Sequence, residues 1–287
     1  MSSIKIFSDS TSDLPKSILE QYDIGIVPLY VTFGDQDYRD GVDLLPKRLY
    51  ELVDQHGVLP KTAAPSPGDF VKAFEPHVKE GRHIIYIGLS SHLSATIQNA
   101  TLASQMLEEE PGSVTVIDSL NLSTGIGQQV YRAALLAEEG RTVEEIVVHI
   151  EEMRKHIETE FIIDTLDYLY KGGRCSGLQN IVGTLLRIRP VIKVIDGKMT
   201  PANRVRGKRE KALEQLLNNA LALKDQMDDE TIFVTHSFSE EDAAYIQAQL
   251  KEKTNAKNVF LSDAGCVISS HCGTNTIGIV FAKSSTT

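Results

Sequence analysis

The sequence predicts an α/β fold, and three observations support that prediction. Over residues 1–155, short apolar runs alternate with helical patterns, which is typical of a parallel sheet connected by helices. From about residue 159 onward, strands and helices continue without that strict alternation, so we expect a mixed α/β second half. The length of 287 residues fits one large or two medium domains.

The strands expected in the first half are short apolar runs at residues 3–8, 24–33, 83–88 and 114–119. Between 24–33 and the next helix, residues 34–44 are rich in turn formers and suggest a hairpin-like excursion. Helical patterns cover residues 16–22, 46–56, 68–78, 97–107 and 143–156, and a loop runs into a helix across 121–140. Thr142 and Glu145 form a capping box at the start of the helix at 143–156.

The second half contains a hairpin before its last helices and strands. Residues 191–205 form two strand-like runs joined by Asp196-Gly197, a pair preferred in type I′ turns. The remaining elements are helices at about 208–225 and 239–253, a strand at 231–237, and strand-like runs at 259–265, 266–273 and 276–283.

Polar residues follow three of the expected parallel strands, where open α/β sheets place their ligands. In the fullest case an apolar run ends at Gly88 and is followed by four hydroxyl residues, Ser90, Ser91, Ser94 and Thr96. The first turn of a helix has unpaired N–H groups and a partial positive charge, so this stretch can form an anion site. The plainer interpretation is that Ser91 or Ser94 caps the helix.

Three other segments carry weaker signals. Residues 9–13 (DSTSD) suit a metal or a phosphate, although a turn with an N-cap is the simpler interpretation. Residues 121–127 (NLSTGIG) have no lysine, and the chain has no GxxxxGK[ST] or GxGxxG motif, so nucleotide binding has weak support. Arg174 follows the turn formers Gly172 and Gly173, and it either meets an anion or simply lies at the surface.

A serine-hydrolase-like enzyme acting on an acyl substrate is an alternative function. Residues 88–92 (GLSSH) are similar to the GxSxG nucleophile elbow, although His92 replaces the second glycine. Such an enzyme would use Ser90 or Ser94 with His271. A regulatory protein that binds another small acid is a third class.

Composition limits the classes of partner. The net charge of −10 argues against nucleic acid, although a basic cluster at residues 204–209 suggests an acidic partner protein. No apolar run approaches the roughly 18 residues of a membrane span, and the N-terminus lacks a signal-peptide core, so we expect a cytoplasmic protein. Cys175, Cys266 and Cys272 show no CxxC pair, which fits free thiols better than disulfides or a metal site.

Taken together, these segments resemble the DegV family, the bacterial fatty-acid-binding proteins that serve a fatty acid kinase. The resemblance covers almost the whole chain, and its motifs are specific as an ordered set rather than singly. The matching segments are DSTSDLP (9–15), TAAPS (62–66), GLSSHLSAT (88–96), VIDS (116–119), LDYLYKGGR (166–174), DG with NRVRGK (196–208) and GCVISSHCG (265–273).

The resemblance implies an N-terminal parallel three-layer α/β/α domain over residues 1–157. It implies a C-terminal two-layer mixed α/β domain over residues 158–287, with a lipid tunnel between the two. A long-chain fatty acid would be bound with its tail buried and its carboxylate near the surface. A separate ATP-binding kinase subunit would then phosphorylate it to an acyl phosphate. The chain itself is expected to be a non-enzymatic lipid-binding subunit, with no cofactor or metal beyond the fatty acid ligand.

The resemblance also implies roles for five residues. Thr62, Ser94 and His271 would hold the carboxyl group. Arg174 would meet the acyl phosphate, and Arg206 would contact the kinase subunit.

The chain departs from the family pattern at both ends of the implied pocket. His92 stands where the family has glycine, and Thr274-Asn275 replaces a Pro-Gly pair. Because glycine adopts backbone conformations that other residues avoid, these departures bear directly on the shape of the pocket.

Overall fold

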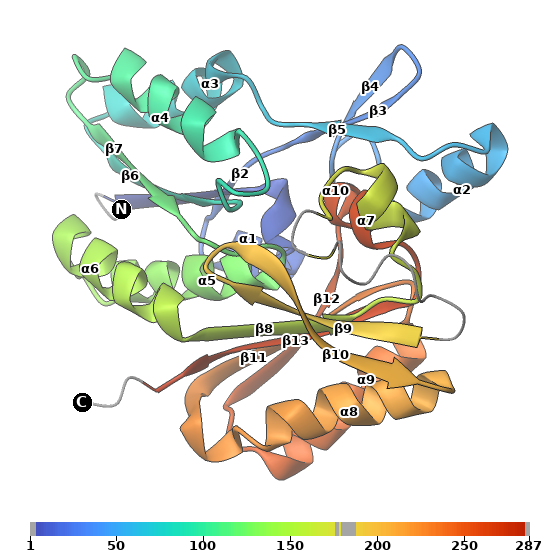
Figure 1. The fold of residues 1–287 in the computed structure, drawn as a ribbon. Coiled ribbons are helices and arrows are strands. Elements are labelled where there is room, and N and C mark those ends of the chain that lie inside the picture. Colours follow the sequence, from blue (N-terminus) through green and yellow to red (C-terminus); the bar gives the residue numbers. More distant parts are fainter. Residues whose placement is uncertain (1–3, 176–177, 179–187, 285–287) are drawn as a thin grey trace.

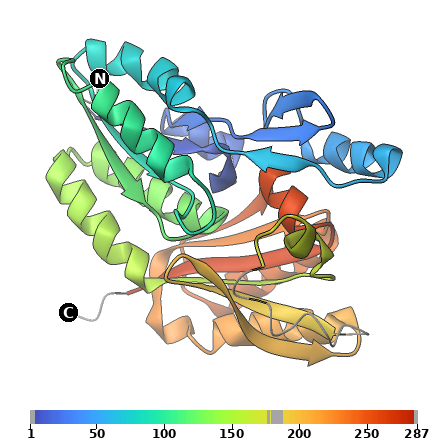
Figure 2. The ribbon, with the colours of Figure 1, turned by 45° about the horizontal axis from the view of Figure 1, so that its top comes forward.

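The protein consists of two stacked sheets with a long helix, α5 (Thr124–Glu138), between them (Figures 1 and 2). A computed structural model describes residues 4–175, 178 and 188–284. The first sheet is entirely parallel, and its strands in spatial order are β2 (Gly25–Val27), β1 (Ile4–Asp9), β6 (His83–Gly88) and β7 (Ser113–Asp118). The alternation of strands and helices in the first half is therefore a parallel α/β unit, as predicted.

Helices cover both faces of this sheet, which confirms the predicted three layers. On one face, α3 (Pro67–Lys79) and α4 (Thr96–Met106) enclose an aromatic core in which the rings of Phe7, Phe74 and Tyr86 pack at 5.1–5.9 Å. On the other face lie α5 and α6 (Val143–Met153). The capping box predicted for α6 is present, with Thr142 and Glu145 each bonding the other's backbone N–H.

The single strand expected over residues 24–33 is wrong. The segment splits at Pro28 into β2 and β3 (Tyr30–Phe33), which belong to different sheets. Proline has no backbone N–H and cannot continue a hydrogen-bonded ladder, so the chain turns there. A small antiparallel sheet follows, in which β3 pairs with β4 (Gln36–Arg39) and with β5 (Lys61–Ala63). The helix α2 (Pro46–His56) connects β4 to β5.

The second large sheet has six strands and is mixed, as expected. Its strands in spatial order are β10 (Lys198–Arg206), β9 (Ile188–Ile195), β8 (Ile157–Ile162), β13 (Thr276–Lys283), β11 (Met227–Ser237) and β12 (Asn258–Asp263). Only the β11–β12 pairing is parallel among these. Asp196 and Gly197 both have positive φ, at 48° and 76°, so the predicted β9–β10 turn has the backbone of a type I′ hairpin.

Helices also cover both faces of the second sheet. Its outer face is packed by α8 (Arg209–Leu221) and α9 (Glu240–Lys253). Its inner face meets α5, which therefore contributes to the packing of both sheets. The six-stranded sheet begins at Ile157, but its inner-face core is shared with α5, so the division into domains 1–157 and 158–287 stays a prediction.

The strand-like run expected over 266–273 is also wrong, because Cys266–Cys272 form a helix, α10. Two serines within the run turn their hydroxyls back to the helix backbone. Ser270 Oγ donates to the Cys266 carbonyl at 2.6 Å, and Ser269 Oγ donates to the Ala264 carbonyl at 3.1 Å. These local bonds, together with caps from distant residues described below, outweigh the strand preference of a short apolar run.

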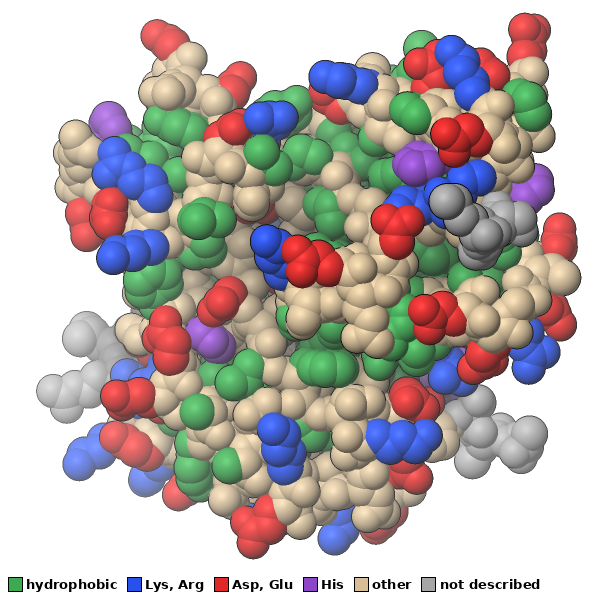
Figure 3. Space-filling model, turned by 180° about the vertical axis from the view of Figure 1, so that it is seen from behind, with side chains coloured by type: hydrophobic (Ala, Val, Ile, Leu, Met, Phe, Trp, Pro, Cys, Tyr) green, Lys and Arg blue, Asp and Glu red, His purple; other side chains and the backbone are tan. Residues whose placement is uncertain are grey.

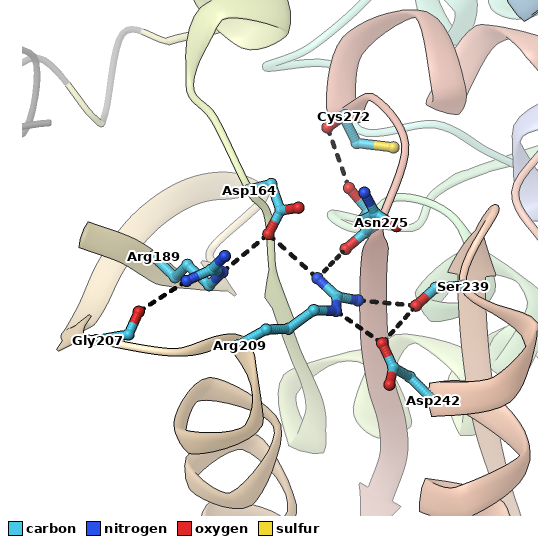
Figure 4. A network of polar contacts seen from close by, with 9 residues as sticks. Asp164, Arg189, Gly207, Arg209, Ser239, Asp242, Cys272 and Asn275 are labelled. Carbon is cyan, nitrogen blue, oxygen red and sulfur yellow. Dashed lines mark hydrogen bonds and ion pairs between the residues drawn. The ribbon is translucent and has the colours of Figure 1, made fainter. Parts of the chain in front are cut away.

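The basic cluster at residues 204–209 spans two elements of the fold. Arg206 ends strand β10, whereas α8 begins at Arg209. Figure 4 shows the Arg209 guanidinium in a network of ion pairs, in which Nη1 donates to Asp164 at 3.1 Å and Nε to Asp242 at 2.7 Å. Arg209 Nη1 also donates to the Asn275 carbonyl at 2.8 Å, which ties α8 to the loop between α10 and β13.

The surface mixes charges of both signs. On the face shown in Figure 3, acidic and basic side chains are interspersed rather than gathered into one basic surface. Among the described helices, none combines the length and apolar character needed to cross a membrane. In the same residues, no cluster of three or more His, Cys, Asp or Glu side chains could hold a metal ion.

Candidate functional site

A cavity of about 920 Å³, including open space at its mouth, is lined by residues of the six-stranded sheet, of β5 and α10, and of the loops that follow strands β6 and β7. Much of its wall is apolar, with contributions from Leu29, Leu89, Leu93, Leu122, Phe161 and Val267. A ligand with a long hydrocarbon part suits such a wall, because apolar surface is removed from water on binding.

Four polar residues predicted from the sequence come together along this cavity. Thr62 comes from β5, Ser94 from the loop before α4, Arg174 from the turn after α7 (Asp167–Lys171), and His271 from α10. All four are partly exposed. We therefore regard this end of the cavity as its mouth.

His271 is bonded to Thr62 and is held neutral. Its Nε2 lies 2.9 Å from Thr62 Oγ1. Burial, followed by the nearby Arg174 charge, lowers the pKa of His271 to about 4. The imidazole thus carries no charge near pH 7, and it can orient Thr62 without adding a cation to the mouth.

The surroundings of the ring decide its tautomer. His271 Nδ1 is buried and has no hydrogen-bond partner in the described residues, because it packs against the Gly172 backbone. A buried N–H without an acceptor is costlier than a buried lone pair, so we assign the proton to Nε2. Nε2–H then donates to Thr62 Oγ1, which frees the Thr62 hydroxyl hydrogen for a ligand.

Gly172 makes this packing possible. A Cβ atom at position 172 would lie 2.2 Å from His271 Nδ1, closer than any side chain tolerates. Its neighbour Gly173 has a φ of 71°, which fits the turn predicted for this pair. The two glycines therefore serve different purposes, one giving room to His271 and the other turning the chain.

Ser94 and Arg174 complete the mouth. Ser94 Oγ lies 2.7 Å from Thr96 Oγ1 and accepts weakly from the Thr96 N–H at 3.3 Å, so it does assist the start of α4. Arg174 donates through Nε to the Leu93 carbonyl at 3.4 Å and through Nη1 to the Gly172 carbonyl at 2.8 Å. Arg174 has five N–H donors, so these bonds fix the guanidinium while leaving donors for an anion.

Two buried carboxylates hold the start of α10. Asp40 accepts from the N–H groups of Cys266 at 2.7 Å and Val267 at 3.3 Å, and Asp13 accepts from Gly265 N–H at 2.8 Å. Burial raises the pKa of both carboxyl groups. The N-terminus of α10 is therefore already supplied with acidic groups by the chain itself.

The DSTSD segment has the simpler of its two predicted roles. Asp9 caps a short 3-10 helix, Ser10–Ser12, by accepting from the Thr11 N–H at 3.0 Å. Its other carboxylate oxygen accepts from the Tyr86 hydroxyl at 2.7 Å and the Leu89 N–H at 3.0 Å. These bonds use both oxygens of Asp9, so the segment is a turn and a cap.

The contacts do not assemble a serine-hydrolase triad. Ser90 is buried and donates to the Gly197 carbonyl at 2.9 Å, while Ser94 bonds Thr96. His271 bonds Thr62 instead of either serine, and its Nδ1 meets no carboxylate in the described residues. A nucleophile, a base and an orienting acid are thus not connected here.

Both departures from the family pattern are accommodated. His92 does not have a positive φ, so its backbone needs no glycine, and its exposed side chain lies against Gly197 in the β9–β10 turn. Asn275 adopts a φ of 59°, a left-handed conformation that asparagine tolerates better than most residues. The backbone around the mouth is thus kept without the two glycines.

Sequence reasoning missed several residues of this region. Asp40 and Asp13 support α10 from more than two hundred residues away, and Gly172 gives room to His271. Thr124 and Thr235 also line the cavity. Asp13, Gly172 and Thr124 lie in segments that the sequence pattern singles out, but no local pattern indicates these roles for them, and the Asp40-Gly41 pair indicates only a turn.

Comparisons with known proteins agree with this architecture. A family model described as "Uncharacterised protein, DegV family" matches residues 3–284. A DegV domain-containing protein of Clostridium acetobutylicum is 36% identical over 284 residues, which cover 99% of each chain.

Two solved structures are similar over nearly their whole length. A fatty-acid-binding DegV family protein from Thermus thermophilus has 32% identity and a TM-score of 0.91, covering 98% of this chain and 99% of its own. A stearic-acid-binding protein from Eubacterium ventriosum has 28% identity and a TM-score of 0.86, covering 98% of both chains. From the family model and these relatives, the chain belongs to the DegV family.

Proposed function

We propose that this protein binds a long-chain fatty acid, with the carboxylate at the cavity mouth and the tail inside. The observation that carries the proposal is the cluster of neutral donors at the mouth of a largely apolar cavity. Thr62 and Ser94 supply hydroxyls, and His271 orients Thr62 while staying neutral. Similar proteins from Thermus thermophilus and Eubacterium ventriosum that bind fatty acids support the same ligand class.

Energetics favour a tail-dominated ligand. Burying about 14 methylenes contributes roughly 11 kcal/mol before ordering costs, at about 0.8 kcal/mol for each CH₂. The mouth then needs to satisfy only the carboxylate. Hydroxyl and backbone donors near the start of α4 provide that, with Arg174 as the nearby positive charge.

The direct test is to identify the ligand that accompanies the protein. Mass spectrometry of an organic extract from purified protein should find a long-chain fatty acid in near-stoichiometric amount. Ser94→Ala should weaken rebinding of octadecanoate to delipidated protein by about five-fold, the value of one hydrogen bond. Ser91→Ala is the control, since Ser91 is exposed and does not line the cavity. Absence of fatty acid from the extract, with no rebinding, would refute the proposal.

We propose further that the bound carboxylate is presented to a separate ATP-binding kinase subunit in the cytoplasm. A carboxylate oxygen would attack the γ-phosphorus of ATP, forming an acyl phosphate as ADP leaves. The unused donors of Arg174 would meet the added negative charge. Arg206, which is exposed at the end of β10, would contact the partner.

The partner step has its own test. With an ATP-binding fatty acid kinase subunit present, Arg206→Ala should lower acyl phosphate formation while fatty acid binding is unchanged. Lys251→Ala, another exposed basic residue but on α9, should leave both unchanged. Arg174→Lys should reduce phosphorylation more than binding, because lysine lacks the planar fork of donors. Equal rates in wild type and Arg206→Ala would remove Arg206 from the partner surface.

A further inference from the structure

The inner part of the cavity is not purely hydrocarbon-like. Three threonines line it, Thr124 at the start of α5, Thr159 on β8 and Thr235 on β11. Their exposures are 0%, 3% and 6%, whereas the polar residues of the mouth are all partly exposed. The cavity wall therefore holds a second, buried group of hydroxyls besides the partly exposed ones at the mouth.

The hydroxyls of Thr124 and Thr235 form an incomplete pair. Their Oγ1 atoms lie 2.6 Å apart, so one hydroxyl donates to the other. Neither has another hydrogen-bond partner among the described residues, which leaves the second hydroxyl hydrogen without an acceptor. Thr159 donates to Asn121 Oδ1 at 2.9 Å and retains free lone pairs. The inner wall thus offers one unused donor and several unused acceptors.

A glycine lies beside this pair on the neighbouring strand. In the six-stranded sheet, Thr235 on β11 is opposite Gly278 on β13, and Gly278 is in turn opposite Phe161 on β8. All three residues line the cavity, and a Cβ atom at Gly278 would come within 3.1 Å of the Phe161 Cβ, so Phe161 packs closely against this glycine. Gly278 therefore puts no side chain next to Thr235.

A plain alkyl tail cannot use these groups. Methylenes neither donate nor accept hydrogen bonds, so a tail packed there would leave a buried hydroxyl hydrogen unpaired. A second carboxylate would bring a charge with no opposite charge beside it. A neutral hydroxyl fits, because it accepts the unused hydrogen and donates its own to a free lone pair.

We propose that the cavity selects a long-chain fatty acid that carries a hydroxyl group on the inner part of its chain, bonded by Thr124 and Thr235. The inference rests on the proposed function, since it takes the carboxylate to lie at the mouth. It adds a second polar site to the cavity and names the ligand class as hydroxylated fatty acids. The hydroxyl pair is then a specificity determinant and has no part in holding the carboxylate.

The test compares dissociation constants on delipidated protein. The probes are octadecanoate and a series of singly hydroxylated octadecanoates, with the hydroxyl moved along the inner half of the chain. At least one isomer should bind wild type about five-fold more tightly than octadecanoate. The double variant Thr124→Val/Thr235→Val, which keeps the shape of both side chains and removes both hydroxyls, should abolish that preference, and Thr124→Ser/Thr235→Ser should retain it.

Thr276→Val provides the matched control. Thr276 lines the same cavity, but its hydroxyl is already committed to the Cys272 carbonyl at 3.0 Å, so the preference should persist in this variant. The inference is overturned if no isomer binds wild type more tightly than octadecanoate, or if the preference survives in Thr124→Val/Thr235→Val. Failure of every probe to bind would instead refute fatty acid binding itself. The wild-type series decides the outcome even if a variant does not fold.

Discussion

Two helices that border the cavity begin in different ways. The first N–H groups of α10 are met by Asp13 and Asp40, two buried carboxyl groups supplied by the chain. The start of α4 has no acidic residue in its first turn, and among the side chains of the described residues only Ser94 Oγ accepts from its backbone N–H groups. A helix start favours negative charge, and only at α4 is that charge left for a ligand to supply.

This difference supports the proposed position of the ligand carboxylate at the start of α4. In the proposed binding mode, α10 contributes through its last turn, where His271 bonds Thr62, because its first turn is already occupied. The start of α4 would then be the one that is left for the ligand.

The largest expected effect comes from removing a carboxylate that the chain supplies. Asp40→Ala leaves the N–H groups of Cys266 and Val267 buried without an acceptor, which should cost about 3 kcal/mol of unfolding free energy. Denaturant unfolding of delipidated protein measures the loss. Asp43→Ala, which removes an exposed carboxylate that pairs with Arg39, should cost far less stability than Asp40→Ala, because exposed ion pairs are screened by water. Similar losses in the two variants would contradict the role given to Asp40.

The two ends of α10 should respond oppositely to acid. The pKa of His271 is lowered to about 4 from an ordinary 6.5, so between these pH values the unfolded chain takes up a proton that the folded protein refuses. Stability from His271 is therefore complete above about pH 6.5 and is lost as the pH falls toward 4, by about 2 kcal/mol. The raised pKa values of Asp13 and Asp40 have the opposite sign.

The difference between two pH profiles isolates the His271 contribution. The unfolding free energies of delipidated wild type and His271→Gln should be measured from pH 7.5 to about pH 4. The contributions of Asp13 and Asp40 are the same in both proteins, so they cancel in the difference between the two profiles. The wild type should lose more stability than the variant as the pH falls. Parallel profiles would show that His271 is not held neutral in the folded protein.

Crowding His271 should disturb the mouth alone. Gly172→Ala places a methyl group where His271 Nδ1 now lies, so the ring must move away from Thr62. We expect about a ten-fold loss of octadecanoate affinity, corresponding to about 1.4 kcal/mol. The same substitution in a His271→Ala background should have little further effect. A full loss in both backgrounds would mean that Gly172 acts through another contact.

The smallest effect comes from giving α4 a carboxylate of its own. Gln98→Glu adds a negative charge to the exposed first turn, which should raise stability by about 0.5 kcal/mol and weaken fatty acid binding a few-fold through repulsion. Gln105→Glu makes the same change in the last turn of α4. Gln105→Glu should neither raise stability nor weaken fatty acid binding. Equal fatty acid affinities of the two variants would argue against a ligand carboxylate near the start of α4.

Local patterns predicted the parts of the fold that depend on neighbouring residues. The Asp196-Gly197 turn and the capping box of α6 follow from residues within a few positions of each other. The helix α10 could not be predicted in this way, because Asp13 and Asp40 reach it from the opposite end of the chain.

In the candidate site, too, the roles that depend on distant residues could not be predicted from local patterns. Thr62 and His271 are 209 positions apart, and family resemblance, rather than spacing, brought them together before the structure did. The sequence predicts Gly172 only as a turn former, and the roles of Gly172 and of the Thr124–Thr235 pair come from what the fold places beside them. Pro28 does carry a local signal, because a proline cannot continue a strand ladder, and the segment at 24–33 divides there.

The orientation of the bound acid tests the central claim most directly. A crystal structure of delipidated protein loaded with octadecanoate brominated at its terminal carbon would locate the tail end by anomalous scattering. The account predicts bromine inside the cavity, with the carboxylate within hydrogen-bond distance of Thr62 Oγ1 and Ser94 Oγ. Bromine beside Thr62 and Ser94, with the carboxylate at the inner threonines, would contradict it.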